Sequence, residues 1–381
     1  MGGCPPYYQP ALLGIDAQPL LGPRTGVYRY LKTLLDELLA GPSASSIRLF
    51  AFQFMRDCVL PAEDGWRDYD VRCIRLFPGR LYFKLLQAGV AFPVDLDCDS
   101  YFFSNFVGYP VRSGRTAVTV HDLAYLRYPQ FVERKNLLYL RMALAPALRR
   151  ADRIIAVSAT TAEDIDEFFG LRSKVTVIPN AVSPEFHPIV ASEANSQLAG
   201  YGLTRPFFLC VGTIEPRKNF DGAVRAYGLL PSDLRESFDL VIAGGRGWRE
   251  ASFHEAVERS PVRNRIRLVG PVTDETLRAL YNQAAALIVC SHYEGFGLPI
   301  VEAMACGCPV IGTKVSAIPE VAGDAGLLVP PGSDDALATA MAEVARDSTV
   351  RDRLRQLGAE RAKQFRAGPI AARVLELLQA S

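Results

Sequence analysis

Short apolar runs rich in valine and isoleucine alternate with amphipathic stretches along almost the whole chain. The apolar runs predict buried strands, and the amphipathic stretches predict the helices that connect one parallel strand to the next. This alternation is typical of α/β proteins. Because a single hydrophobic core rarely grows beyond about 250–300 residues, the 381 residues predict two domains. We expect two doubly wound domains that bind a ligand in a cleft, at the carboxyl ends of their strands.

The two halves contain similar sets of elements, separated by a polar, proline-containing stretch. We place the N-terminal domain at residues 1–185, a linker at 186–204 and the C-terminal domain at 205–365. The predicted strands are Leu12–Asp16, Ile47–Phe52, Ala117–His121, Arg153–Val157, Val175–Ile178, Phe207–Val211, Leu240–Ala243, Ile266–Val269, Ala286–Cys290, Pro309–Gly312 and Gly326–Val329. The predicted helices are Gly26–Leu39, Asn136–Arg150, Ala162–Phe169, 219–229, 274–284, 299–306, 334–346 and 348–365.

The charge balance, the length of the apolar runs and the cysteine spacing narrow the class of protein. The 42 lysines and arginines nearly equal the 41 aspartates and glutamates, so a dedicated nucleic-acid binder is not expected. No run approaches the roughly 18 apolar residues that a membrane-spanning helix needs. The eight cysteines show neither a C-x-x-C pair nor zinc-site spacing, which is typical of a protein in the reducing cytoplasm.

The segment Cys290–Ile311 carries the clearest chemical signal. It predicts a strand, a loop with Gly295 and Gly297, and a helix that begins near Pro299. Backbone N–H groups at such a helix start form an anion-binding site. Glu294 in the loop and Glu302 in the helix could flank one phosphorylated ligand. The spacing alone also fits an ordinary strand-to-helix corner with a surface glutamate.

The full string E-G-F-G-L-P-x-x-E-A-M-A-x-G-x-P-V-I from Glu294 to Ile311 resembles the E-x7-E signature of glycosyltransferase family 4. This family comprises retaining glycosyltransferases of the GT-B fold, in which two Rossmann-like domains face a central cleft. Further segments that match the family pattern are Gly22–Val27, His121-Asp122, Arg153–Ser158, Val177–Val182 and Val211–Asn219. The likeness covers about residues 11 to 370. It implies that residues 366–381 form a helix that returns toward the N-terminal domain.

The resemblance assigns roles on the donor side of the cleft. It implies that Glu302 binds the ribose hydroxyls of a nucleotide sugar and that Glu294 contacts the donor sugar, as a nucleophile or as a positioning group. Arg217 and Lys218 would stabilise the charge that develops on the diphosphate leaving group. We expect this pair to face Glu294 and Glu302 across one cleft.

Backbone and glycine positions complete the implied site. Amides at Gly295, Phe296, Gly297 and Leu298 would hold the sugar or the diphosphate, and backbone groups near Val269 would contact the base. Gly22 and Gly26 would belong to a flexible loop near the diphosphate and the acceptor, although a plain turn fits these residues too. His121 would face the transferred sugar or the acceptor, and His292 could shape the pocket.

No metal is expected, since Arg217 and Lys218 would supply the positive charge that a metal ion supplies in many GT-A glycosyltransferases. The one candidate for metal binding, Asp95-Leu-Asp97-Cys-Asp99, precedes a strand-like segment and is better interpreted as a solvated turn.

Two stretches combine basic with apolar residues, which is what an anionic membrane surface attracts. The first runs from Arg72 to Leu86 and contains Arg75, Arg80 and Lys84; the second lies between Arg127 and Arg153. Helix faces packed on the N-terminal sheet explain the same pattern. We expect a cytoplasmic protein. The first interpretation adds peripheral contact with the membrane, and the second does not.

The segment Val315–Glu320, V-S-A-I-P-E, is similar to the bacterial polysaccharide mannosyltransferase branch of the family. We therefore predict transfer of a hexose, first of all mannose from GDP-mannose, to a saccharide or polyprenyl-linked oligosaccharide. UDP-glucose or another nucleotide sugar is the alternative donor. A GT-B sugar-nucleotide epimerase and a non-catalytic sugar-nucleotide-binding subunit are the alternative functions. A Rossmann oxidoreductase is disfavoured because the complete G-x-G-x-x-G is missing at Gly244–Gly247.

Overall fold

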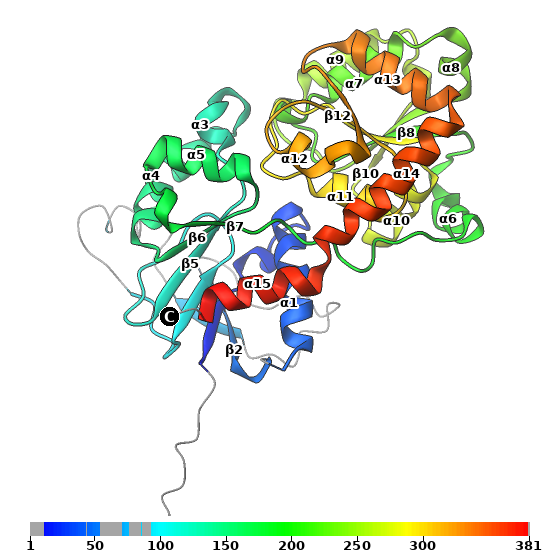
Figure 1. Cartoon of the computed structure of the whole chain (residues 1–381). Coiled ribbons are helices and arrows are strands. Elements are labelled where there is room, and N and C mark those ends of the chain that lie inside the picture. The colour runs from blue at the N-terminus through cyan, green and yellow to red at the C-terminus, as the bar shows by residue number, and fades with distance from the viewer. Residues whose placement is uncertain (1–10, 43, 54–70, 76–84, 86–92, 380–381) are drawn as a thin grey trace, which may run out of the picture.

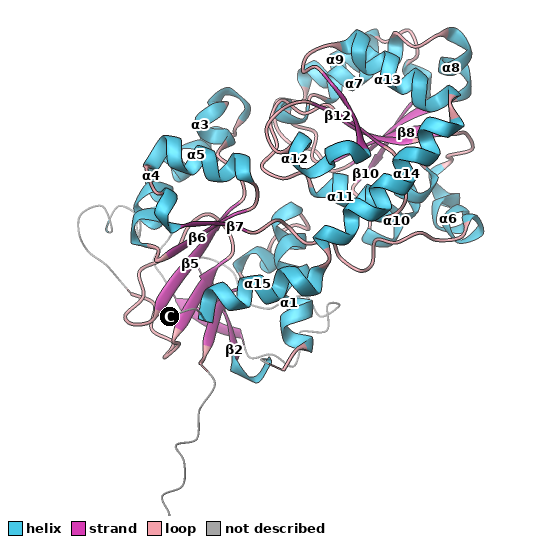
Figure 2. Ribbon diagram, viewed as in Figure 1, coloured by secondary structure: helices cyan, strands magenta, loops and turns pink. Residues whose placement is uncertain are grey.

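The computed structural model describes residues 11–42, 44–53, 71–75, 85 and 93–379. Within these residues the chain forms two sheets, one of seven strands and one of six, in which all pairings between the strands are parallel (Figures 1 and 2). Parallel strands require crossover connections, and helices supply most of them. The predicted architecture of two doubly wound α/β domains is confirmed.

The N-terminal sheet has the order β3-β2-β1-β4-β5-β6-β7, so the direction of winding reverses between β1 and β4. Its strands are β1 (Leu13–Asp16), β2 (Ile47–Gln53), β3 (Val71–Arg75), β4 (Ser100–Phe103), β5 (Arg115–Val120), β6 (Arg153–Ala156) and β7 (Val175–Val177). The strand list derived from the sequence lacks β3, an edge strand with the sequence V-R-C-I-R, and β4, which was anticipated only as a strand-like segment. Short, partly exposed edge strands produce a weak apolar signal.

Helices cover both faces of this sheet. α1 (Gly26–Ala40) packs against α15 (Ala367–Gln379), at the end of the chain, on one face. Residues of α4 (Arg134–Arg150) and α5 (Ala159–Phe169) share a second core with the other face. α3 (Ala124–Arg127) follows β5. The amino terminus of α5 is fixed by Ser158, whose side chain accepts a hydrogen bond from the Thr161 amide.

The C-terminal sheet has the order β10-β9-β8-β11-β12-β13. Its strands are β8 (Phe207–Val211), β9 (Asp239–Ala243), β10 (Ile266–Gly270), β11 (Ala286–Val289), β12 (Val310–Thr313) and β13 (Gly326–Val329). The helices of this half are α6 (Ala191–Leu198), α7 (Phe220–Gly228), α8 (Ser232–Ser237), α9 (Ala251–Arg259), α10 (Asp274–Gln283), α11 (Leu298–Ala305), α12 (Ile318–Ala322), α13 (Asp334–Arg346) and α14 (Ser348–Ala362).

The stretch expected to be a linker contains α6, which the sequence interpretation missed. This helix packs on α10, and its buried residues are Ala194 and Leu198. Two buried positions in eight residues give too short an apolar stripe to be distinguished from a polar connection. The linker therefore carries an element that lies on the C-terminal domain.

The two domains meet through a continuous hydrophobic core and through backbone contacts. Residues of β1 and α1 belong to the same buried cluster as residues of α10, α11 and α15. The amide of Val182 donates to the carbonyl of Phe365, 2.8 Å away, where the chain crosses back before α15. The helix expected at 366–381 occupies Ala367–Gln379 and lies beside α1 (Figure 1).

None of the helices in the described part of the chain combines the length and the apolar character that a membrane span needs.

Candidate active site

A cluster of two cations and a carboxylate lies where β8 and β11 end in the C-terminal sheet. Glu294, in the loop after β11, accepts hydrogen bonds from Arg217 Nη1 at 2.9 Å and from Lys218 Nζ at 2.6 Å. Ser291 Oγ donates to the same carboxylate at 2.6 Å. Because β8 and β11 are neighbours in the sheet, their carboxyl ends bring these residues together.

Arg217 and Lys218 were expected to face Glu294 and Glu302 across the cleft, and for Glu294 this expectation is wrong. Arg217 and Lys218 contact Glu294 directly within one domain, whereas Glu302 pairs with Arg29 of α1. The short 3-10 helix η8 (Pro216–Lys218) presents both cations from one turn beside the loop. Glu215 joins the cluster through its bond to Arg217 Nη2, at 2.5 Å. The cluster thus contains two carboxylate side chains and two cations.

The Glu294 carboxylate is held in its ionised form. Burial leaves it 5% exposed and by itself would raise its pKa. The charges of Lys218 and Arg217 outweigh burial, and the pKa falls to about 2. At neutral pH Glu294 is therefore a carboxylate whose two oxygens both accept hydrogen bonds from cations.

A second cluster surrounds Glu302, on α11, and joins the two domains. Arg29 of α1 donates from Nη1 to both oxygens of Glu302, at 3.1 and 3.2 Å, and from Nη2 to Asp274 at 2.6 Å. The hydroxyl of Tyr281 donates to Glu302 at 2.8 Å. Burial raises the pKa of Glu302, while Arg29 and the Tyr281 hydrogen bond oppose that rise. Arg29, Asp274 and Tyr281 were not among the site residues expected from the sequence.

The glycine-rich loop before α11 meets the N-terminal domain at very short range. A Cβ atom on Gly295 would lie 1.8 Å from the carbonyl oxygen of His121, so no other residue fits there. Gly297 has φ of +97°, which favours glycine. The Phe296 side chain is buried against Phe365, so any contact of this residue with a ligand would come from its backbone. The group that lies closest to Gly295 is therefore a backbone carbonyl of the N-terminal domain.

His121 follows β5 and lies against aromatic rings of its own domain. Its Nε2 is 2.8 Å from the carbonyl oxygen of Ser104, which can only accept, so Nε2 carries the proton. Its ring makes edge contacts with Tyr30 at 4.8 Å and Phe106 at 5.5 Å. Burial lowers the pKa of His121. The imidazole is therefore neutral at pH 7, with Nδ1 as a hydrogen-bond acceptor.

The loop before α1 and the segment near Val269 that is expected to contact the base each lie at the carboxyl edge of their own sheet. Gly26 begins α1, and a Cβ there would be 3.9 Å from Leu298 at the start of α11. Gly22 precedes it in an extended conformation. Val269 lies near the end of β10, four residues before Thr273, which caps α10. The structure thus gathers most of the expected site residues along the opposed carboxyl edges of the two sheets.

Comparisons with known proteins identify the family. The family model described as "Glycosyltransferase Family 4" matches residues 67–186, and the one described as "Glycosyl transferases group 1" matches residues 200–361. Over 258 residues the chain is 35% identical to the O-antigen chain mannosyltransferase B of Escherichia coli, covering 67% of this chain and 68% of that protein. The chain belongs to glycosyltransferase family 4. It is a glycosyltransferase of the GT-B fold, as its sequence motifs predict.

Two further similarities place this family 4 glycosyltransferase among its relatives. It is 33% identical over 215 residues to the serotype-specific mannosyltransferase WbdA of Escherichia coli, and the alignment spans 55% of this chain and 26% of that longer protein. Its fold is similar to that of Anabaena HepE, whose structure was solved in complex with UDP-glucose. That likeness has a TM-score of 0.75 at 18% identity and covers 97% of this chain and 100% of HepE.

The aspartates considered for metal binding make other contacts in this glycosyltransferase. Asp95 pairs with Arg112 at 3.0 Å, and Asp99 accepts a hydrogen bond from the amide of Leu12 at 2.7 Å. Within the residues that the structure describes, no three His, Cys, Asp or Glu side chains converge where a metal ion could be held.

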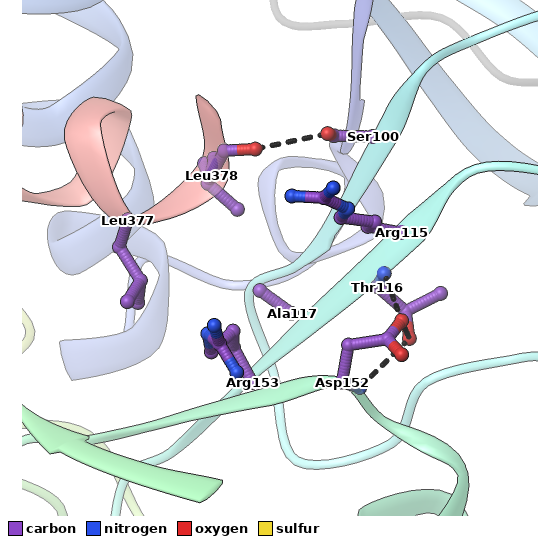
Figure 3. Close-up of a pocket in the computed structure, with 8 residues that line it drawn as sticks. All are labelled: Ser100, Arg115, Thr116, Ala117, Asp152, Arg153, Leu377 and Leu378. Carbon is purple, nitrogen blue, oxygen red and sulfur yellow. Dashed lines mark hydrogen bonds between the residues drawn. The ribbon is translucent and has the colours of Figure 1, made fainter. Parts of the chain in front are cut away.

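A pocket of about 160 Å³ lies away from this site, at the amino-terminal ends of β4, β5 and β6 (Figure 3). Ser100 Oγ donates to the carbonyl of Leu378 at 2.9 Å beside it, which fastens α15 to the sheet. Arg115 and Arg153 line the pocket from neighbouring strands. Ligands of doubly wound sheets bind at the carboxyl ends of the strands, so we do not assign this pocket to the reaction.

Proposed function

We propose that this family 4 glycosyltransferase is a retaining mannosyltransferase of bacterial polysaccharide or glycan synthesis. Its donor is GDP-mannose, and its acceptor is a saccharide or a polyprenyl-linked oligosaccharide. Its similarity to the O-antigen chain mannosyltransferase B and to the mannosyltransferase WbdA supports mannose as the sugar. The reaction keeps the anomeric configuration of the donor, as the E-x7-E resemblance implies.

The observation that carries this proposal is the contact of Arg217 and Lys218 with Glu294. Both cations are 17% exposed or less, and each is held by an ion pair with Glu294. Cations that are already oriented need little reorganisation when a leaving group gains charge, and such preorganised electrostatics is usually the largest single contribution to catalysis. In our proposal the diphosphate of the donor binds this pair, and no metal ion is required.

The transfer itself follows from this placement. The bond between the anomeric carbon of mannose and the β-phosphate oxygen breaks, and Arg217 and Lys218 stabilise the negative charge left on the diphosphate. The acceptor oxygen forms the new bond on the same face of the sugar. Its proton passes to the departing phosphate oxygen. The protein then has to orient the two substrates and neutralise charge, and it need not supply a base.

In this scheme Glu294 positions the donor sugar and is not the nucleophile. Its two oxygens are occupied by Lys218, Ser291 and Arg217. A carboxylate with a pKa near 2 is a weak base, and nucleophilicity falls with basicity. Glu302 binds the ribose hydroxyls, His121 contacts the transferred sugar or the acceptor, and the loop amides from Gly295 to Leu298 hold the sugar or diphosphate.

A panel of nucleotide sugars tests the assigned donor. We expect GDP-mannose to be used with kcat/KM at least about tenfold above that of UDP-glucose, because a few pocket contacts set donor choice. Mass spectrometry of a mannosyl oligosaccharide acceptor measures transfer, and NMR of the product measures the anomeric configuration. A new sugar nucleotide formed without acceptor would instead indicate an epimerase. Failure with every donor would favour a non-catalytic subunit.

A membrane contact through α4 is part of the proposal. The carboxyl-terminal half of this helix is packed in the N-terminal core, with Leu144 and Leu148 fully buried. The amino-terminal half turns Leu138, 60% exposed, outward beside the exposed Lys135 and Arg141. We propose that this half rests on the cytoplasmic face of an anionic membrane, where a lipid-linked acceptor would be found. Most of the other basic stretch, 76–84 and 86, lies outside the described residues.

Reversing charge on α4 should detach the protein from membranes. We expect Lys135→Glu combined with Arg141→Glu to reduce binding to phosphatidylglycerol-rich vesicles by about tenfold or more, since each basic residue near such a surface contributes about 1 kcal/mol. Cosedimentation measures the bound fraction. The same vesicles should bind an Arg225→Glu variant, altered on the exposed face of α7, as well as the wild type. Unchanged binding of the α4 variant would contradict the contact.

A further inference from the structure

Arg29 is the residue through which the N-terminal domain reaches the carboxylate of Glu302. Its guanidinium bonds Glu302 and Asp274 at once, with Nη1 on the first and Nη2 on the second. The same group lies over the ring of Phe186, 5.7 Å from its centre. Its Nε–H is buried and, in the part of the chain that the structure describes, has no hydrogen-bond partner. One donor of Arg29 thus stays available beside two carboxylates.

Arg29 favours the ionised form of Glu302. It is 2% exposed, and burial by itself raises its pKa. The charged and titratable groups that face it are Arg29 from α1, Asp274 and Tyr281 from α10, and Cys306 beyond the end of its own helix. Burial also raises the pKa of Tyr281, which keeps its hydroxyl protonated and donating. Of these groups, Arg29 alone carries positive charge.

A vicinal diol requires an ionised carboxylate as its partner. Both hydroxyls of a ribose can donate to a carboxylate, which is an acceptor only, whereas a protonated carboxyl group has lost part of that capacity. The residue that keeps Glu302 ionised therefore controls how well it can hold a ribose. In this protein that residue comes from the opposite domain.

We propose that Arg29 is a positioning residue for the nucleoside half of the donor, completing the ribose-binding carboxylate from across the cleft. This inference rests on the role of Glu302 in the proposed function. The ribose site then includes residues of both domains, because Arg29 of α1 bonds Glu302 of α11. Asp274 holds the guanidinium in place through its bond to Nη2.

The test compares two diphosphate nucleosides that differ in the ribose diol alone. GDP and 2′,3′-dideoxy-GDP are titrated by calorimetry into the full-length wild type, Arg29→Met and Lys32→Met, which removes a cation one turn along α1. We expect the wild type to prefer GDP by at least about tenfold, as expected for charge-assisted hydrogen bonds. Arg29→Met should lose most of that preference, Arg29→Lys should keep part of it, and Lys32→Met should retain it.

The pH dependence gives a second readout that a merely structural role would not move. Without Arg29 the pKa of Glu302 rises further, so the carboxyl group is protonated at a higher pH. The affinity of Arg29→Met for GDP, relative to wild type, should then fall as the pH is lowered. Titration of the phosphate itself cancels in this ratio because both proteins bind the same nucleotide.

Three outcomes would overturn the inference. Tighter GDP binding by Arg29→Met would make the arginine a competitor of the ribose. An equal loss of affinity for both nucleotides would show that Arg29 only holds the two domains together. A cost that persists in the Glu302→Gln background would show that Arg29 does not act through that carboxylate. If Glu302→Gln itself leaves the diol preference intact, the proposed role of Glu302 fails instead.

Discussion

Replacing Glu294 with glutamine is expected to lower kcat for glycosyl transfer by about 10²–10³-fold. Glutamine keeps the shape of the side chain but removes the charge that Arg217 and Lys218 now neutralise. The two cations then carry an uncompensated positive charge, which favours binding of a diphosphate. We therefore expect affinity for the nucleoside diphosphate to be unchanged or higher while kcat falls. Mass spectrometry of product formation and calorimetry with GDP separate these two effects.

The control for this variant is Glu343→Gln, which changes an exposed glutamate on α13 in the same domain. It should retain the activity and the melting temperature of the wild type. Glu294→Ala, tested beside it, removes the side chain as well as the charge. Undiminished transfer by both Glu294 variants would refute the assignment of this residue to the donor sugar.

Replacing Lys218 with methionine should reduce kcat by about 10²-fold, because one cation that stabilises the leaving group is lost. Arg217→Met should have at least as large an effect, because Arg217 also bonds Glu215 and the carbonyl of Tyr293. Lys218 is the largest cause that lowers the pKa of Glu294 below its ordinary value. Its removal raises that pKa, so the activity of Lys218→Met should fall on acidification at a pH where the wild type is unaffected.

The comparison variant for these cations is Arg225→Met, on the exposed side of α7, where Arg225 pairs with Asp221 and Asp334. It should leave transfer unchanged. Activity of the wild type should also survive treatment with EDTA. Activity that chelation abolishes and a divalent cation restores would contradict the assignment of charge stabilisation to Arg217 and Lys218.

Elements with strong local signals were predictable from the sequence. β8 and β13 occupy the same residues in the prediction and in the structure, and α13 begins where Ser333 caps a run of apolar periodicity. Buried parallel strands are continuous apolar runs, and long amphipathic helices have a regular period, so both leave a local pattern. β3 and the short helices α3, α6, α8, α9 and α12 were missed because an edge strand and short helices bury few side chains.

The candidate site was predictable where one motif carries it. Glu294 and Glu302 are eight residues apart in a single loop and helix, and Arg217 and Lys218 follow one strand. Which carboxylate each cation would meet was not predictable from the motif. Arg29 and Glu302 are separated by 273 positions, and no periodicity or spacing links residues so distant in the chain.

The sequence by itself determined the class of the fold, the family and the residues of the E-x7-E segment, because each is written in contiguous residues. The order of strands in the sheets decided that the cationic turn after β8 would meet the loop after β11. The packing of one domain against the other decided that Arg29 would pair with Glu302 and that Gly295 would lie against His121. Burial and partner charges then set the protonation of each carboxylate, since electrostatic energies depend on distance and solvent exposure in space.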